Sequence, residues 1–167
     1  MTISKVVVSM YKTNCYIISI GNDCLVIDPG DDYPKIKTAT DNKNVLGAVV
    51  THSHIDHDGA INNFENVYNY NNLTEGKHKI GPFSFEIIYT PGHRYDGITL
   101  YFEDEKAMFT GDFLFYGTIG RTDLEGSSKE DMQKSIDKIK NYPDCKVYPG
   151  HGWTTTLKRE KEKNIFF

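Results

Sequence analysis

The feature that most constrains the fold is a cluster of three histidines and an aspartate within six residues, directly after an apolar run. His52, His54, Asp56 and His57 follow the stretch Leu46–Val50, whose apolar side chains are typical of a buried strand. Histidine is the commonest metal ligand in proteins, and an aspartate oxygen binds the same ions. Ligands of α/β sheets bind outside the carboxyl ends of the strands. We therefore expect a loop at a sheet edge that carries metal-binding side chains.

Three later segments each place one more histidine or aspartate beside a glycine, next to an apolar run. Glycine permits a positive φ angle or a close backbone approach, which lets a short loop direct one side chain over a sheet edge. Each pair alone is typical of an ordinary turn. The residues that these segments add are His93, Asp112 and His151.

Together these side chains supply enough ligands for two metal ions. We expect the first ion at His52, His54, His93 and Asp112, and the second at Asp56, His57, Asp112 and His151, so that Asp112 is shared. A polar turn with solvated histidines is the alternative, and four ligand-type residues at this spacing disfavour it. The sixth histidine, His78, lies between two lysines, and we interpret it as a surface residue.

The order of these motifs resembles that of the metallo-β-lactamase-fold hydrolases over nearly the whole chain. Within that group the sequence is most similar to the type II glyoxalase-like branch, also called hydroxyacylglutathione hydrolase-like. The segments that carry this narrower resemblance are Asn14–Tyr16, Asp28–Gly30, Thr110–Phe115, Gly120–Leu124 and Tyr148–Gly152. The resemblance implies an α+β fold with a four-layer αββα sandwich. The length of 167 residues fits one domain, which we expect over residues 1–167.

Such a centre is suited to hydrolysis. Two divalent ions about 3.5–4 Å apart hold a water between them and lower its pKa towards about 7, and one ion also stabilises the oxyanion formed from a substrate carbonyl. A thiol leaves without a strong general acid. We therefore expect a metal-bridging hydroxide to cleave a thioester of the S-2-hydroxyacylglutathione type, such as S-lactoylglutathione. Asp112, which bridges the metals, and Asp56, which orients the hydroxide, are the expected catalytic residues. The resemblance implies zinc, with iron or manganese as alternatives.

Other activities are compatible with parts of the same pattern. Persulfide dioxygenases are similar around Gly120–Leu124, and in such an enzyme only His52, His93 and Asp112 would bind a single iron. Full-length type II glyoxalases carry a further helical domain that grips glutathione, which we do not expect here, so another ester or thiol carrier is a second alternative. A non-enzymatic metal-binding domain and an exported β-lactamase are disfavoured by the complete ligand set and by the lack of an export signal.

The composition limits the partners of the chain. With 19 Lys and Arg against 23 Asp and Glu, the net charge is −4, which disfavours binding to nucleic acid or to an anionic membrane. The chain has neither a signal peptide nor a long apolar span, so we expect a cytoplasmic protein whose partner is a small-molecule thioester. An odd number of cysteines without Cys-x-x-Cys spacing predicts buried or half-buried thiols at Cys15, Cys24 and Cys145.

Short apolar or alternating runs predict most of the secondary structure as strands. These runs are Val6–Val8, Cys15–Ile20, Cys24–Ile27, Leu46–Val50, Val67–Tyr70, Phe83–Tyr89, Ile98–Phe102, Ala107–Phe109 and Lys146–Tyr148, with hairpin turns at Gly21–Asp23 and Glu103–Lys106. The expected helices are Pro34–Asp41, Gly59–Phe64, Ser128–Tyr142 and a solvated tail, Thr154–Asn164.

Three positions near the motifs have two interpretations each. Arg121 and Asp123 either form an ion pair that braces their loop or position a substrate carboxylate, and we favour the pair. Asp28 either fixes a turn or supports a metal-binding histidine, and we favour the turn. Tyr116 either packs or lines the pocket, and we favour packing.

Overall fold

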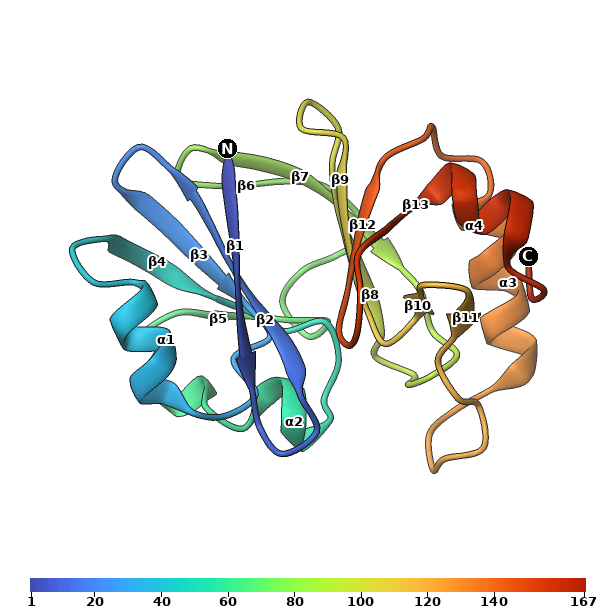
Figure 1. Ribbon diagram of the computed structural model, residues 1–167, viewed down its shortest axis with the longest axis horizontal. Coiled ribbons are helices and arrows are strands. Elements are labelled where there is room, and N and C mark those ends of the chain that lie inside the picture. Colours follow the sequence, from blue (N-terminus) through green and yellow to red (C-terminus); the bar gives the residue numbers. More distant parts are fainter.

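Two β-sheets face each other at the centre of the molecule, with helices outside both (Figure 1). The computed structural model describes all residues from 1 to 167. The helices α1 (Tyr33–Ala39) and α2 (Ile55–Asp58) accompany the first sheet, and α3 (Lys129–Ile139) and α4 (Leu157–Lys163) lie beside the second. This arrangement confirms the expected four-layer αββα sandwich of an α+β fold. None of these helices has the length and apolar character needed to cross a membrane.

The first sheet combines an antiparallel half with a parallel half. Its strands, in spatial order, are β1 (Thr2–Val8), β2 (Thr13–Ile20), β3 (Asp23–Ile27), β4 (Asn44–Val49) and β5 (Val67–Tyr68). The strands β1, β2 and β3 are antiparallel, and β3, β4 and β5 are parallel. The predicted hairpin between β2 and β3 is confirmed, and Gly21 adopts a φ of 61° in its turn.

The second sheet directs three strand ends toward one edge. Its strands, in spatial order, are β13 (Thr155–Thr156), β12 (Lys146–Pro149), β9 (Ala107–Gly111), β8 (Ile98–Phe102), β7 (Phe83–Tyr89) and β6 (Gly76–Ile80). Because β8 is antiparallel to both β7 and β9, and β12 is parallel to β9, the strands β7, β9 and β12 run in the same direction. Their carboxyl ends therefore share an edge. The predicted hairpin between β8 and β9 is confirmed.

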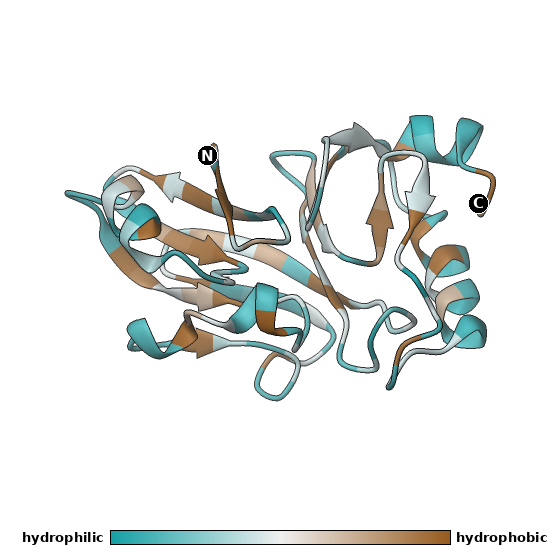
Figure 2. Cartoon of the chain, turned by 60° about the horizontal axis from the view of Figure 1, so that its bottom comes forward, coloured by the Kyte–Doolittle hydropathy of each residue, from teal (hydrophilic) through white to brown (hydrophobic).

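Alternating side chains along the strands form three apolar layers between the four structural layers. In β3, for example, Leu25 and Ile27 belong to the cluster between the sheets, whereas Cys24 and Val26 pack with Ile36 of α1. On the other side, Met108 of β9 joins the cluster that includes residues of α3 and α4. Figure 2 shows the resulting pattern, with brown strands inside and largely teal helices outside. All three cysteines are free and buried, as predicted.

Several expected elements differ in the structure. The predicted helix Gly59–Phe64 is wrong: α2 ends at Asp58, and only a 3-10 turn, η1 (Ile61–Asn63), follows. The strand β6 was not expected, and neither were β13 and the hairpin of β10 (Leu114–Phe115) and β11 (Thr118–Ile119). The tail helix is shorter than predicted, and it is not fully solvated, because Leu157 and Glu160 are buried. For α3, Ser128 caps the helix by accepting from the Asp131 N–H.

Candidate metal centre

The loops at one edge of the two sheets bring all seven predicted ligands together. The segment after β4 supplies four of them, and the segments after β7, β9 and β12 supply one each; these residues are His52, His54, Asp56, His57, His93, Asp112 and His151. The expected loop is partly helical, because Asp56 and His57 lie in α2. The carboxylates of Asp56 and Asp58 in its first turn suit the positive end of the helix dipole.

The first predicted ligand group gathers around the end of β4. One ligand atom each from His52, His54 and His93 lies within 4.8 Å of the others. The His93 Nε2 and His54 Nδ1 atoms are only 3.0 Å apart. Three imidazole nitrogens that converge in this way are typical of ligands around one cation.

The second predicted group lies next to the first. Asp56, His57 and His151 again offer ligand atoms within 4.8 Å of one another. The His151 Nε2 atom lies 3.2 Å from Asp56 Oδ2 and 3.3 Å from His57 Nε2.

Asp112 faces both groups. Its Oδ1 atom lies 3.3 Å from His57 Nε2, and its Oδ2 atom lies 3.4 Å from His151 Nε2 and 3.6 Å from His93 Nε2. Asp112 also forms a third candidate group with His52 and His57. This position between the two groups is the one expected of a shared ligand.

Two buried polar atoms indicate that the residues fit metal ions. His52 Nε2 and Asp112 Oδ1 are buried and have no hydrogen-bond partner in the protein. Such unpaired groups are costly in a folded protein unless an ion or another ligand satisfies them. Both atoms belong to the candidate groups, and nitrogen and oxygen donors of this kind bind divalent cations.

Other groups orient three of the histidines from behind. The His57 Nδ1 atom lies 2.9 Å from Asp28 Oδ2, the His93 Nδ1 atom lies 2.9 Å from the carbonyl oxygen of Arg121, and the His52 Nδ1 atom lies 3.1 Å from Thr51 Oγ1. Asp28 therefore has both of the roles considered for it: its carbonyl oxygen accepts from the Gly30 N–H at 2.9 Å in the turn, and its carboxylate supports His57. It also accepts from the N–H and the hydroxyl of Thr51, and this shared anchor fixes the start of the ligand segment.

Thr13, which no sequence motif marks as part of the site, supports the second group. Its buried hydroxyl donates to Asp56 Oδ2 at 2.9 Å and so fixes this carboxylate beside His151. By contrast, the predicted ion pair between Arg121 and Asp123 is confirmed, with N–O distances of 2.7 and 2.9 Å. Both side chains of this pair are exposed to solvent.

Two glycines are required by the close packing of these loops. Gly111, directly before Asp112, adopts a φ of 50°, which L side chains rarely adopt. A Cβ atom at Gly150 would lie 2.3 Å from Asp112 Oδ1 and 2.6 Å from His57 Cε1. Both positions confirm the expectation that glycine allows these loops to direct side chains over the sheet edge.

The carboxylates of the candidate centre strongly shift the pKa values of two of its histidines. Burial lowers the pKa of His57, but the carboxylates of Asp28 and Asp112 outweigh this effect and raise the pKa well above its usual value. Burial also lowers the pKa of His151, but Asp112 and Asp56 raise it to about 9. Without a bound metal, the carboxylates therefore favour the protonated form of these two histidines. A divalent cation at the same position would balance the negative charge instead.

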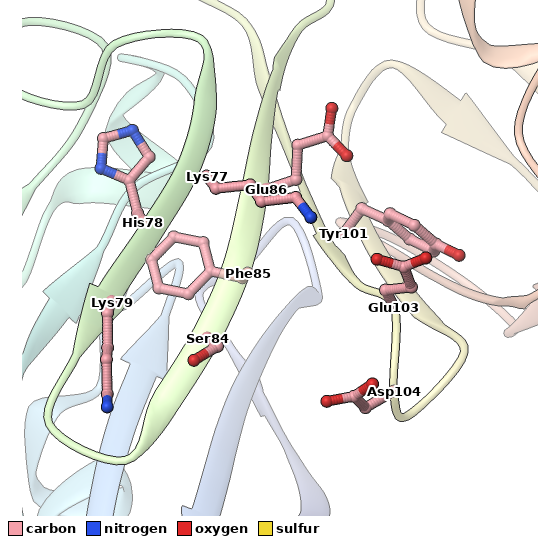
Figure 3. Close-up of a pocket in the computed structure, with 9 residues that line it drawn as sticks. All are labelled: Lys77, His78, Lys79, Ser84, Phe85, Glu86, Tyr101, Glu103 and Asp104. Atoms are coloured by element: carbon pink, nitrogen blue, oxygen red, sulfur yellow. The ribbon is translucent and has the colours of Figure 1, made fainter.

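A hollow of about 490 Å³ lies away from the candidate metal centre, on the strands β6, β7 and β8 and the turn after β8 (Figure 3). It is lined mainly by charged and polar side chains, including Lys77, Lys79, Glu86 and Glu103. None of the seven candidate ligands lines it. His78 lies there, half-buried, with its Nε2 atom 2.6 Å from the Thr74 carbonyl oxygen, so it remains outside the metal centre.

A four-layer sandwich with such a His and Asp cluster at the edge of its sheets defines a class of proteins that bind divalent metals. The sequence pattern of the Metallo-beta-lactamase superfamily matches residues 10–83 and 75–151 of this chain. The chain belongs to this superfamily, whose fold and metallohydrolase character it shares.

Individual relatives are similar over almost their whole length. The probable metallo-hydrolase YqgX of Bacillus subtilis is 30% identical, over 93% of this chain and 92% of that protein. The hydroxyacylglutathione hydrolase GloC of Haemophilus influenzae is 28% identical, over 99% and 98%. Among solved structures, BLEG-1 B3 metallo-beta-lactamase has a TM-score of 0.94 at 28% identity over 99% of both chains. TTHA1623 in a di-iron-bound form has a TM-score of 0.89 at 28% identity, over 98% of this chain and 100% of that chain.

Proposed function

We propose that this metallohydrolase cleaves a thioester of the S-2-hydroxyacylglutathione type. The observation that carries the proposal is the convergence of two groups of three ligand-type side chains, with Asp112 between them. A relative that aligns with this chain over 98% of its own length is a hydroxyacylglutathione hydrolase, which supports this substrate class. We also propose zinc as the metal; the donor set is equally suited to iron, which a similar structure contains.

The residues present have distinct tasks in this reaction. His52, His54 and His93 would hold one ion, Asp56, His57 and His151 would hold the other, and Asp112 would contact both. When bound, such ions act as Lewis acids and lower the pKa of water towards about 7. We assign to Asp56, whose carboxylate accepts from the Thr13 hydroxyl, the role of accepting a hydrogen bond from the attacking water and orienting it. The departing thiolate needs no strong general acid, and a thioester suits a site that offers none beyond its ligands.

The second ligand group favours hydrolysis over persulfide oxidation. A mononuclear iron persulfide dioxygenase would use only His52, His93 and Asp112. In this chain Asp56, His57 and His151 converge as closely as the first group, and Asp28 and Thr13 hold two of them in place. Support of this kind for ligand-type side chains beyond the first group is expected of a centre with two ions.

The test is the variant Asp112→Ala, measured with S-lactoylglutathione and a panel of other thioesters. We expect it to abolish hydrolysis and to weaken metal retention, because Asp112 faces both groups. His78→Ala is the matched control, since this histidine lies outside the centre, and it should retain both properties. Activity of Asp112→Ala equal to that of the control would refute the ligand assignment, and an inactive wild type would refute the proposed substrate class.

A further inference from the structure

An open hollow lies directly beside His151, on the side of the β10–β11 hairpin. It encloses about 380 Å³. Its lining residues are Phe115, Tyr116, Thr118, His151, Gly152 and Trp153. Three of these six are aromatic, and His151 belongs to the candidate metal centre. A group that occupies the hollow would therefore lie within a few atoms of the reacting carbonyl.

The aromatic side chains of the hollow are unusually exposed. Trp153 is 76% exposed and Tyr116 is 44% exposed. Their rings meet edge to face, with centroids 5.8 Å apart. Large apolar surfaces that remain in water carry a free-energy cost, and their grouping in a concave site is typical of ligand contact.

The wall of the hollow is nevertheless fixed in place. The Arg159 guanidinium lies 3.7 Å from the centroid of the Tyr116 ring, and Arg159 Nη1 donates to Glu160 at 2.6 Å. The fully buried Glu160 carboxylate also accepts from the Gly117 N–H at 2.8 Å, which holds the tip of the hairpin on α4. A wall that is ordered before binding reduces the entropy that a ligand must overcome.

The charges around the hollow favour an uncharged occupant. Among its lining residues only His151 is a candidate cation, and this side chain faces the carboxylates of the metal centre. The positive charge of Arg159 behind the wall is balanced by Glu160. In another protein a cavity of about 150 Å³ accommodates benzene, so the volume here is ample for a phenyl ring.

We propose that this hollow is a substrate subsite for an uncharged aromatic group next to the thioester carbonyl. The proposal rests on the proposed thioesterase function and narrows its substrate class. The aromatic group belongs either to the acyl part or to the thiol part of the substrate. Either source offers the same flat apolar surface to Trp153 and Tyr116, with edge-to-face or stacked contacts.

The kinetic test compares Trp153→Ala with wild type on three thioesters, namely S-lactoylglutathione, S-mandeloylglutathione and the lactoyl thioester of benzyl mercaptan. We expect kcat/KM for one of the two aromatic thioesters to fall about tenfold, and that for S-lactoylglutathione to fall less than about twofold. A loss on the mandeloyl substrate assigns the acyl part to the hollow, and a loss on the benzyl substrate assigns the thiol part.

Two further variants separate ring contact from general damage. Trp153→Phe retains an aromatic ring and should keep most of the preference for the aromatic substrate. Phe166→Ala removes an exposed aromatic side chain that does not line the hollow, and it should behave as wild type. Equal losses on all three substrates in Trp153→Ala, or no loss on any, would overturn the proposal.

A binding measurement tests the subsite independently of hydrolysis. Trp153 is the only tryptophan of the chain, so its fluorescence reports on the hollow alone. We expect S-benzylglutathione to change this emission and to bind about tenfold more tightly than S-methylglutathione, and we expect Tyr116→Ala to reduce that difference. If no thioester is hydrolysed, the proposed function fails while this titration still decides on the subsite. Equal binding of the two thioethers would overturn it.

Discussion

Asp28 shows how single residues outside the ligand set determine the geometry of the centre. Its carboxylate contacts the outer nitrogen of His57, which leaves the Nε2 atom free to face the cluster. The Arg121 carbonyl oxygen does the same for His93. A hydrogen bond to one ring nitrogen selects the tautomer and the ring orientation, and it makes the other nitrogen a better ligand.

We predict that Asp28→Asn weakens metal retention by about 10- to 100-fold, because the amide keeps the size of the carboxylate but not its charge. Competition with a chelator measures this loss. Asp31→Asn, at an exposed position in the same turn, is the matched control and should retain metal as wild type does. Similar retention by the two variants would mean that Asp28 contributes only to the turn.

The convergence of the candidate ligand residues was predictable from sequence, whereas their supporting groups were not. His93, Asp112 and His151 stand beside glycines after apolar runs, which is a local and chemically distinctive pattern. Thr13 contacts Asp56 over 43 positions of sequence, and Arg121 contributes a backbone carbonyl oxygen, which every residue has. For Asp28, a Pro-Gly turn offered a sufficient local explanation, and only the three-dimensional contact with His57 reveals the further role of its carboxylate.

At the scale of elements, α4 anchors the hairpin that follows Asp112. Glu160 of this helix accepts hydrogen bonds from Gly117, Thr155 and Asn164, and it also contacts Arg159. Burial raises the pKa of Glu160, but these hydrogen bonds outweigh that effect and lower the pKa below its usual value of 4.5. Because the folded-state pKa is lowered, the stabilisation is full above about pH 4.5 and is lost as the pH falls through the lower, folded-state value.

We predict that Glu160→Gln lowers the free energy of unfolding by about 1.5–3 kcal/mol at pH 7, because hydrogen bonds to a charged group usually contribute this much to stability. The difference from wild type should shrink as the pH falls below about 4.5, since the wild-type carboxyl then becomes neutral as well. Urea unfolding of both chelator-treated proteins, at pH 7 and below about pH 4.5, measures this difference in unfolding free energy. Glu162→Gln, exposed on the same helix, should show no such dependence. A difference that stays constant with pH would refute the role of the Glu160 charge.

Helices and strands with regularly spaced apolar residues were predicted, and those without such a spacing were missed. The capped amphipathic helix α3 and the buried strands β3 and β8 follow their patterns closely. The edge strand β6, Gly-Lys-His-Lys-Ile, has only one apolar side chain, and two-residue strands such as β10 are too short to show a period. The small residues Gly59 and Ala60 suggested a helix start, but the helix begins earlier, where His54 is extended and acidic residues fill the first turn.

At the scale of the whole molecule, the candidate centre joins the two halves of the sandwich. The segment after β4 of the first sheet supplies four candidate ligands, and the segments after β7, β9 and β12 supply three from the second. Bound ions would therefore link both sheets as well as activate water. The four-layer arrangement itself was predicted through the family resemblance, because local periodicity does not reveal which sheet a strand joins or how two sheets face each other.

We predict that metal binding stabilises the fold. An ion at about 1,000 times its dissociation constant adds about 4 kcal/mol, which corresponds to a rise in Tm of roughly 10 °C for a chain of this size. Thermal unfolding with chelator and after addition of Zn²⁺, Mn²⁺ or Fe²⁺ measures the shift. His78→Ala should show the full shift and His151→Ala a smaller one, because only His151 belongs to a ligand group. An unchanged Tm on metal addition would contradict a link between the sheets.

The proposal of a binuclear thioesterase is tested most directly by elemental analysis of protein purified without added metal, combined with an assay of S-lactoylglutathione hydrolysis on the same sample. We predict close to two divalent ions per chain in wild type and close to one in His151→Ala, with hydrolysis proportional to the doubly loaded fraction. A single iron per chain in both proteins, with oxygen uptake in the presence of glutathione persulfide and no thioester cleavage, would contradict a binuclear thioesterase.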